Sequence, residues 1–178
     1  MITLTEKPIL LCGMMGSGKT TIARILARRL NCPWSDLDRI IEKRKGRTIP
    51  ELFDTEGETY FRQLEREELE RVLNEPPSII ALGGGALQSQ EVVNHVRNTG
   101  WLIFLDAPQS VLLERLGRKT GRPLTDSLNK DELRQKIDTL FAQREGFYRQ
   151  AHITIPVGQL TPFEIAEQIE EQIDTMTR

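Results

Sequence analysis

The stretch Gly13-Met14-Met15-Gly16-Ser17-Gly18-Lys19-Thr20 decides the fold of this chain. Its spacing is GxxxxGK[ST], it directly follows an apolar run at residues 9–12, and it opens a segment whose apolar residues recur at helical spacing. Glycines let the backbone wrap closely around phosphate oxygens, while successive N–H groups and the positive end of a helix attract an anion. This succession of strand, loop and helix predicts a binding site for the phosphates of a nucleoside triphosphate.

Each position of the stretch has an expected role. We expect Lys19 to neutralise phosphate charge and to take part in catalysis, and the Thr20 hydroxyl to hold Mg²⁺. The residues expected to contact the nucleotide here are Gly13, Gly16, Ser17, Gly18, Lys19 and Thr20. The alternative is a glycine-rich turn with an accidental lysine. The motif also leaves open whether the γ-phosphoryl group goes to water, to a protein or to a metabolite.

Short apolar runs alternate with longer segments of helical period along the rest of the chain. The strand candidates are residues 9–12, 79–82, 102–105 and 153–157, with a weaker short strand that ends within residues 36–38. Such alternation predicts a parallel sheet covered by helices on both sides. We therefore expect an α/β fold, with a three-layer α/β/α arrangement around a five-stranded parallel sheet, in a single domain of 178 residues.

Composition narrows the classes of partner. The 24 basic residues are balanced by 26 acidic ones, for a net charge of -2, so no bulk positive charge favours a nucleic acid. The sequence has no signal-peptide pattern and no apolar run of membrane-spanning length, which predicts a cytoplasmic protein with no membrane partner. The two cysteines lack CxxC spacing, which favours reduced thiols over a zinc or redox site. Because no heptad pattern is visible, we expect a monomer.

Two carboxylates lie near the end of the weak strand. Asp36 and Asp38 are two residues apart, and at a strand end this spacing is expected to point both side chains to one side of the sheet. One carboxylate would support Mg²⁺ while the other accepts a hydrogen bond from an attacking hydroxyl. A solvated turn is the alternative. Asp106, which ends an apolar run, is a second candidate for the metal, and we favour Asp36.

A glycine triplet and two arginines complete the expected acceptor site. The triplet at residues 83–85 follows a strand candidate, where open parallel sheets bind ligands, although a plain loop is the alternative. Arg144 falls on the apolar stripe of a helix and Arg62 borders another, so each guanidinium is aimed inward and needs an anionic partner. That partner is either a ligand carboxylate or a nearby glutamate such as Glu65 or Glu145.

Taken together, these motifs resemble the shikimate kinase family, a P-loop NTPase group with a nucleoside monophosphate kinase-like fold, and the likeness runs over nearly the whole chain. The six motifs that carry it, in family order, are GMMGSGKT at 13–20, DLD at 36–38, the pair Phe61-Arg62, LGGG at 82–85, GRPL at 121–124, and Arg144 shortly before Tyr148. The resemblance implies transfer of the γ-phosphoryl group of ATP to the 3-hydroxyl of shikimate. The products would be ADP and shikimate 3-phosphate, in aromatic amino-acid biosynthesis through chorismate.

The resemblance also implies roles for particular residues. Those implied for shikimate are Asp38, Arg62, Gly84, Gly85 and Arg144, with Asp38 holding the attacking hydroxyl and acting as a possible base. It implies Mg²⁺ at Thr20 and Asp36 and, separately, an inserted substrate-binding region at about 36–65. A mobile lid at about 115–131 would bring the catalytic Arg122 to the nucleotide, with Arg115 or Arg118 over the adenine.

Two other functions share part of this pattern. A nucleoside monophosphate kinase or a gluconate-type kinase has the same phosphate loop and lid, but does not account for two arginines together with DLD and GGG. A nucleotide-binding switch protein needs the phosphate loop alone and has no small-acceptor pocket. The acceptor site therefore separates the kinase hypothesis from both.

Overall fold

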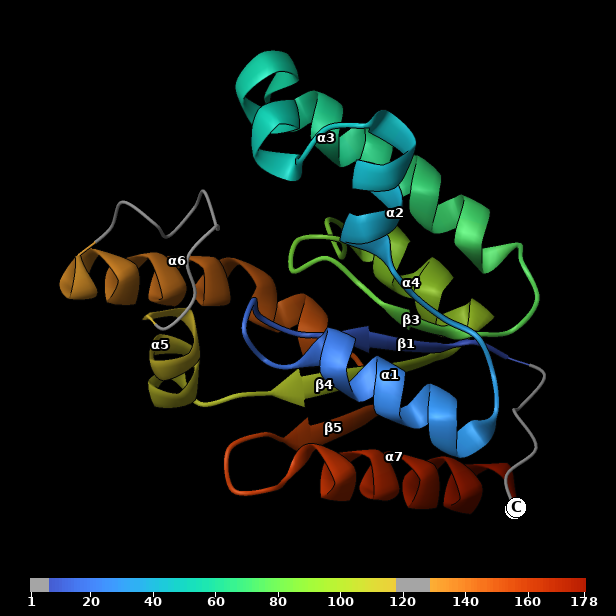
Figure 1. Ribbon diagram of the computed structural model, residues 1–178. Coiled ribbons are helices and arrows are strands. Elements are labelled where there is room, and N and C mark those ends of the chain that lie inside the picture. Colours follow the sequence, from blue (N-terminus) through green and yellow to red (C-terminus); the bar gives the residue numbers. More distant parts are fainter. Residues whose placement is uncertain (1–6, 118–128) are drawn as a thin grey trace.

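The apolar runs of the sequence form the strands of one sheet in the computed structural model, which describes residues 7–117 and 129–178. The strands are β1 (Ile9–Cys12), β2 (Trp34–Asp36), β3 (Ile79–Ala81), β4 (Trp101–Asp106) and β5 (Ile153–Pro156). All neighbouring pairs are parallel, and the order across the sheet is β2-β3-β1-β4-β5 (Figure 1). The expected five-stranded parallel sheet is confirmed.

The segments of helical period form helices, and several of them begin at a capping residue. Within the described ranges the helices are α1 (Lys19–Leu30), α2 (Leu37–Lys45), α3 (Ile49–Leu73), α4 (Gln90–Thr99), α5 (Gln109–Gly117), α6 (Lys130–Tyr148) and α7 (Pro162–Thr177). Thr48 caps α3 in a reciprocal pair with Glu51, and Ser89 caps α4, because their side-chain oxygens accept hydrogen bonds from the first turn. Across residues 7–117 and 129–178, no helix is long and apolar enough to cross a bilayer.

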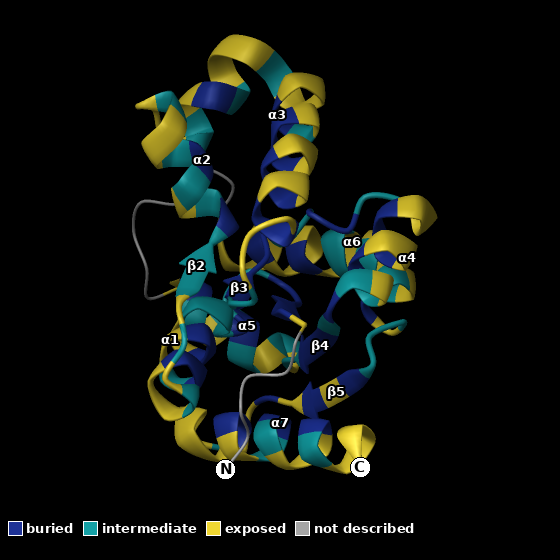
Figure 2. Ribbon diagram, turned by 90° about the vertical axis from the view of Figure 1, so that its right-hand side faces the viewer, coloured by how far each residue is buried: buried dark blue, intermediate teal, exposed yellow. Residues whose placement is uncertain are grey.

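Helices cover both faces of the sheet and give three layers. One cluster of buried side chains joins Leu11 and Ile103 of the strands to Ile22 of α1 and Ile169 of α7. On the other face, Leu10 and the residues on its side of the sheet pack against α2, α3, α4, α5 and α6. Figure 2 shows the buried residues on the strands and on the inward faces of the helices. Both faces of β1 are buried, so all four of its residues are apolar.

The carboxyl ends of the central strands bring distant parts of the chain together. Leu11 of β1 pairs with Ala81 of β3, and Asp36 at the end of β2 pairs with the same Ala81. The loops that leave these three strands therefore start side by side at the C-terminal end of the sheet. Ligands of open parallel sheets bind at this end.

Candidate active site

The phosphate loop connects β1 to α1 and is shaped by its glycines. Gly13 has φ of 137°, and a Cβ atom there would lie 2.7 Å from the carbonyl oxygen of Leu105. Only glycine therefore fits that position. The Nζ atom of Lys19 donates to the carbonyl oxygens of Gly13 at 2.8 Å and Met14 at 3.0 Å, so the lysine crosses its own loop. The buried Ser17 hydroxyl has no hydrogen-bond partner among the residues that the structure describes, which fits a phosphate ligand.

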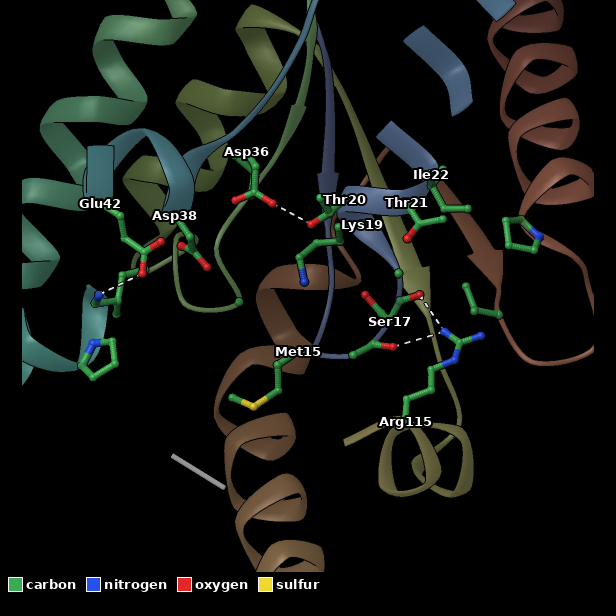
Figure 3. A pocket seen from close by; sticks show the side chains of 18 of the residues that line it. Met15, Ser17, Lys19, Thr20, Thr21, Ile22, Asp36, Asp38, Glu42 and Arg115 are labelled. Carbon is green, nitrogen blue, oxygen red and sulfur yellow. Dashed lines mark hydrogen bonds between the residues drawn. The ribbon is translucent and has the colours of Figure 1, made fainter. Parts of the chain in front are cut away.

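A cavity of about 1070 Å³ opens from this loop. Its wall runs from residues 15–20 of the loop to Asp36, Asp38 and Gly84, and Figure 3 shows Lys19 and both carboxylates pointing into it. Part of the wall is apolar, because Val157 and Ile165 also line the cavity. One hollow therefore has room for a nucleotide and a small acceptor on either side of the lysine.

The side-chain oxygens of Thr20 and Asp36 lie together at the N-terminus of α1. The Thr20 hydroxyl donates to Oδ2 of Asp36 at 2.6 Å, while Oδ1 of Asp36 accepts from the backbone N–H of Arg39 at 3.3 Å. Hydroxyl and carboxylate oxygens are ligands that suit Mg²⁺, which usually keeps water and phosphate ligands as well. Asp106, the competing candidate, lies 3.9 Å from the guanidinium of Arg149. The geometry favours the Thr20 and Asp36 pair.

The path by which Asp38 reaches the cavity differs from our expectation. Strand β2 ends at Asp36, which caps α2, and Asp38 lies in the first turn of that helix. The prediction that strand alternation aligns the two carboxylates was therefore wrong, although both side chains line the cavity. The intervening Leu37 is fully buried and anchors the start of α2.

Asp38 is an unusual carboxyl group. Burial raises its pKa to about 6, and the negative charges of Glu65 and Asp36 act in the same direction, while Lys19 opposes them. A carboxyl with a pKa in this range exchanges a proton readily near neutral pH. Asp38 is thus suited to hold a hydroxyl group and to accept its proton.

The glycine triplet after β3 is the meeting point of the acceptor site. A Cβ atom on Gly83 would lie 2.6 Å from Oδ1 of Asp38 and would also collide with Glu65. A Cβ atom on Gly84 would lie 3.3 Å from Nη1 of Arg144, and one on Gly85 would lie 2.7 Å from Cζ of Arg62.

Three consecutive residues without side chains therefore approach two carboxyl and two guanidinium groups. Gly84 is also close to the phosphate loop, since its Cβ would lie 3.6 Å from the backbone nitrogen of Met15. The plain-loop alternative does not describe this arrangement.

Arg62 is already paired inside the protein. Its Nη1 atom lies 2.7 Å from Oε2 of Glu65, whose carboxylate is 2% exposed, and its Nη2 atom lies 3.2 Å from the exposed Glu58. The glutamate partner that the sequence offered for this arginine is therefore present in the structure. Glu65 also accepts a hydrogen bond from the amide of Gln88 at 3.1 Å. Glu65 was expected only as a partner of Arg62, and Gln88 was not predicted, because only the fold brings Gln88 beside α3.

Arg144 differs from Arg62 in its pairing. No salt bridge to Arg144 is found in residues 7–117 and 129–178, and Glu145, its proposed alternative partner, pairs with Arg149 at 2.6 Å. Tyr148, one turn later on α6, is buried, and its hydroxyl donates to the Gly84 carbonyl oxygen. Burial raises the pKa of Tyr148, while the nearby Arg144 acts in the opposite sense. The hydroxyl is therefore neutral and acts as a donor.

The arginines expected around the nucleotide are only partly described. Nη1 of Arg115, at the end of α5, donates to the carbonyl oxygens of Gly16 at 3.1 Å and Ser17 at 3.2 Å, so this side chain grips the phosphate loop (Figure 3). Arg118 and Arg122 lie outside the described residues, as does the GRPL motif at 121–124.

A phosphate-binding loop that shares one cavity with a carboxyl-bearing acceptor pocket defines a P-loop kinase of the nucleoside monophosphate kinase-like fold. The family model described as Shikimate kinase matches residues 15–174. The chain belongs to the shikimate kinase family, as the motifs predicted.

Relatives from three bacteria match over nearly the full chain. The shikimate kinase of a Sulfurihydrogenibium species is 37% identical over 167 residues, which cover 94% of this chain and 98% of that protein. The solved shikimate kinase from Bacteroides thetaiotaomicron has a TM-score of 0.89 and 34% identity, covering 94% of this chain and 98% of that one. The structure of shikimate kinase from Acinetobacter baumannii in complex with shikimate also has a TM-score of 0.89 and 34% identity, covering 97% and 95% of the two chains.

Proposed function

We propose that this protein transfers the γ-phosphoryl group of ATP to the 3-hydroxyl of shikimate, giving ADP and shikimate 3-phosphate on the route to chorismate and the aromatic amino acids. The observation that carries the proposal is the contact of residues 83–85 with Asp38, Arg144 and Arg62, directly beside Met15 of the phosphate loop. An organic acid whose carboxylate binds the arginines would present its hydroxyl between Asp38 and the nucleotide. Similarity to a shikimate kinase that was solved with shikimate supports this choice of acid.

On the donor side, the phosphates bind along the loop. Gly13, Gly16 and Gly18 offer backbone N–H groups and Ser17 offers its unpartnered hydroxyl, and Lys19 leaves its carbonyl contacts to neutralise the transferring phosphoryl group. The pair Thr20 and Asp36 would hold Mg²⁺, which supplies positive charge against the phosphate oxygens when it is bound. These groups stabilise charge and need no covalent chemistry of their own.

On the acceptor side, Asp38 receives the hydroxyl. Its carboxylate accepts the hydrogen bond of the 3-hydroxyl, orients the oxygen for in-line attack and takes up the proton as the new bond forms. Arg62 and Arg144 bind the substrate carboxylate, and the backbone of Gly84 and Gly85 allows the ring to come close. Positioning by these groups lowers the entropy cost of bringing the two reactants together.

We extend the proposal to the arginines expected around the nucleotide and to the organisation of the whole chain. Arg122 is assigned to the transferring phosphoryl group, and Arg115 and Arg118 to the nucleotide, within a lid at about 115–131. The whole chain is taken as one shikimate kinase domain, residues 1–178, with its substrate-binding region at about 36–65. We further propose a cytoplasmic monomer, which sedimentation of the purified protein would test.

Product analysis tests the proposed reaction. The protein is incubated with MgATP and shikimate, and ADP release is followed by a coupled assay. The product is identified by ³¹P NMR as a phosphomonoester on the 3-oxygen of shikimate. We expect turnover with shikimate and little with gluconate or nucleoside monophosphates. Slow ATP hydrolysis that shikimate does not accelerate would instead support a nucleotide-binding switch protein.

A further inference from the structure

Two side chains outside the proposed substrate contacts connect the loop between β3 and α4, residues 82–89, to the helices that carry the arginines. We call this loop the glycine loop. Tyr148 lies one turn after Arg144 on α6, and its hydroxyl donates to the carbonyl oxygen of Gly84. Gln88 lies near the other end of the loop, and its amide donates to the backbone carbonyl oxygen of Arg62 and to Oε2 of Glu65, both at 3.1 Å. The loop is thus bonded to α6 at one point and to α3 at another.

The ring of Tyr148 is fixed on every side. It is 1% exposed, and it stacks on Phe104 of β4 with ring centroids 5.2 Å apart. Its hydroxyl oxygen lies 4.0 Å from the sulfur of Met14. The hydroxyl therefore reaches Gly84 from a rigid platform in the core and does not follow the loop if the loop moves.

The bond from Tyr148 sets the plane of one peptide unit. In a trans peptide the C=O and the next N–H point in opposite directions, so fixing the Gly84 carbonyl toward Tyr148 points the Gly85 N–H away from the core. Glycine residues resist rotation of this plane weakly, because they have no Cβ atom. The hydroxyl therefore supplies a restraint that the loop lacks by itself, at the residue next to Arg144.

Gln88 restrains Arg62 at both of its ends. One hydrogen bond from the amide reaches the main chain of Arg62, and the other reaches the carboxylate that pairs with its guanidinium at 2.7 Å. Because Glu65 is buried, losing a donor leaves part of its carboxylate without a partner and weakens its hold on Arg62. The orientation of the guanidinium depends on this chain of contacts.

We propose that Tyr148 and Gln88 are positioning residues for the carboxylate-binding pair, which together fix the separation and orientation of Arg62 and Arg144 through the glycine loop. This inference rests on the proposed function, since it assigns both arginines to the shikimate carboxylate. Two-pronged binding of a planar carboxylate needs both guanidinium groups at fixed angles, so small shifts in either one weaken recognition of the acid. Contacts with the rest of the substrate do not depend on these angles.

The test compares an acid with its alcohol. Tyr148→Phe keeps the stacked ring and removes only the hydroxyl, and Gln88→Met keeps the side-chain length and removes the amide. We expect each change to weaken binding of shikimate, measured by calorimetry in the presence of ADP, by about five- to tenfold. Binding of the analogue whose carboxylate is replaced by a hydroxymethyl group should change by less than about twofold, and the KM for MgATP should stay the same.

Matched controls separate positioning from general damage. Tyr60→Phe removes an exposed tyrosine hydroxyl that is bonded to Lys45, and Gln90→Met removes an exposed amide that is bonded to Gln150. Neither should alter binding of the acid or of the alcohol. Thermal unfolding of all four variants checks that the fold is intact.

The possible results separate this inference from the proposed function. Equal weakening for the acid and the alcohol, or no weakening of either in both variants, would overturn the positioning role while leaving the reaction in place. No turnover of shikimate by the unaltered protein would overturn the proposed function and this inference with it. Selective weakening for the acid supports both.

Discussion

The donor and acceptor sides of the cavity are built in opposite ways. On the donor side, eight consecutive residues at 13–20 supply almost everything, and most of their polar groups belong to the main chain. On the acceptor side, the polar groups are side chains from α2, α3 and α6 that meet around three glycines. One side is a local loop, and the other is an assembly that exists only in the folded protein.

This difference predicts how each side responds to change. A loop that binds through N–H groups depends on backbone shape and on its one lysine, whereas an assembly of side chains depends on each contact that orients its members. Donor-side substitutions should therefore affect the nucleotide, and acceptor-side substitutions should affect the acid. The following experiments test whether the two sides respond separately.

The largest effect is expected from Lys19→Ala on the donor side. The change removes the positive charge that we propose for the transferring phosphoryl group, along with the contacts to the Gly13 and Met14 carbonyl oxygens. We expect kcat to fall by about a thousandfold, because a preorganised charge in such a site stabilises the transition state strongly. Steady-state kinetics at saturating shikimate measures this. Lys43→Ala on α2 is the exposed control, and a Lys19→Ala enzyme with normal kcat would refute the role of the lysine.

The second effect, from Asp38→Asn, should separate activity from stability. We expect kcat to fall by about a hundredfold or more, because an amide cannot take up the proton of the hydroxyl. The fold should at the same time become more stable at pH 8, by about 2 kcal/mol, because the buried carboxylate is replaced by a neutral group.

The size of this stability change depends on pH. Asp38 has an ordinary pKa of 3.8 and a folded-state pKa of about 6, so the folded state holds the proton more tightly. The protonated Asp38 therefore contributes stability to the unaltered protein below pH about 4, and this contribution is lost as the pH rises through about 6. The advantage of Asp38→Asn should accordingly be small at pH 4 and fully developed at pH 8. Urea unfolding at pH 4 and pH 8 measures both limits, and Asp54→Asn serves as the exposed control. An equal difference between Asp38→Asn and the unaltered protein at both pH values would contradict the raised pKa.

The same contrast explains what the sequence could predict. The loop at 13–20, the five strands and the helices between them follow from patterns within short segments, and the structure confirms them. The acceptor residues Asp38, Arg62 and Arg144 were selected from their types and their place on apolar faces, and the fold brings each to the glycine loop. Local patterns were sufficient for the candidates.

What the sequence could not predict was the set of contacts between elements. Gln88 is polar and follows a glycine loop, and nothing local indicates that its amide reaches Arg62 and Glu65 across 26 and 23 residues. Helical spacing did allow Arg62 to pair with Glu65, but it could not show that Glu65 is buried. The error at Asp38 has a similar origin, because the point where β2 gives way to α2 depends on a cap, and a cap shifts the boundary by a residue or two.

The third effect concerns Glu65 and should appear only on the acceptor side. Glu65→Gln leaves Arg62 with the exposed Glu58 as its carboxylate partner, so the guanidinium loses its fixed orientation. We expect the KM for shikimate to rise about tenfold with little change in the KM for MgATP, as for other hydrogen bonds to charged groups.

A pH profile distinguishes this role from a loss of packing. The negative charge of Glu65 raises the pKa of Asp38, so Glu65→Gln should lower that pKa and move the acid limb of kcat/KM to lower pH. Glu67→Gln, which removes an exposed carboxylate bonded to Gln63 on the same helix, should leave the profile in place. An acid limb that does not move in Glu65→Gln would show that the two carboxyl groups do not interact.

The smallest effect is expected from Arg115→Ala, which tests a side chain that contacts the phosphate loop from outside the loop itself. The guanidinium donates to two carbonyl oxygens of the phosphate loop, at Gly16 and Ser17, so it supports the loop without touching the expected position of the acceptor. We expect the KM for MgATP to rise about threefold, the effect of one modest hydrogen bond, while kcat and the KM for shikimate stay constant. Arg134→Ala on the exposed side of α6 is the control. If Arg115→Ala raised the KM for shikimate instead, the two sides of the cavity would be coupled through the loop, because the backbone of Met15 lies next to Gly84.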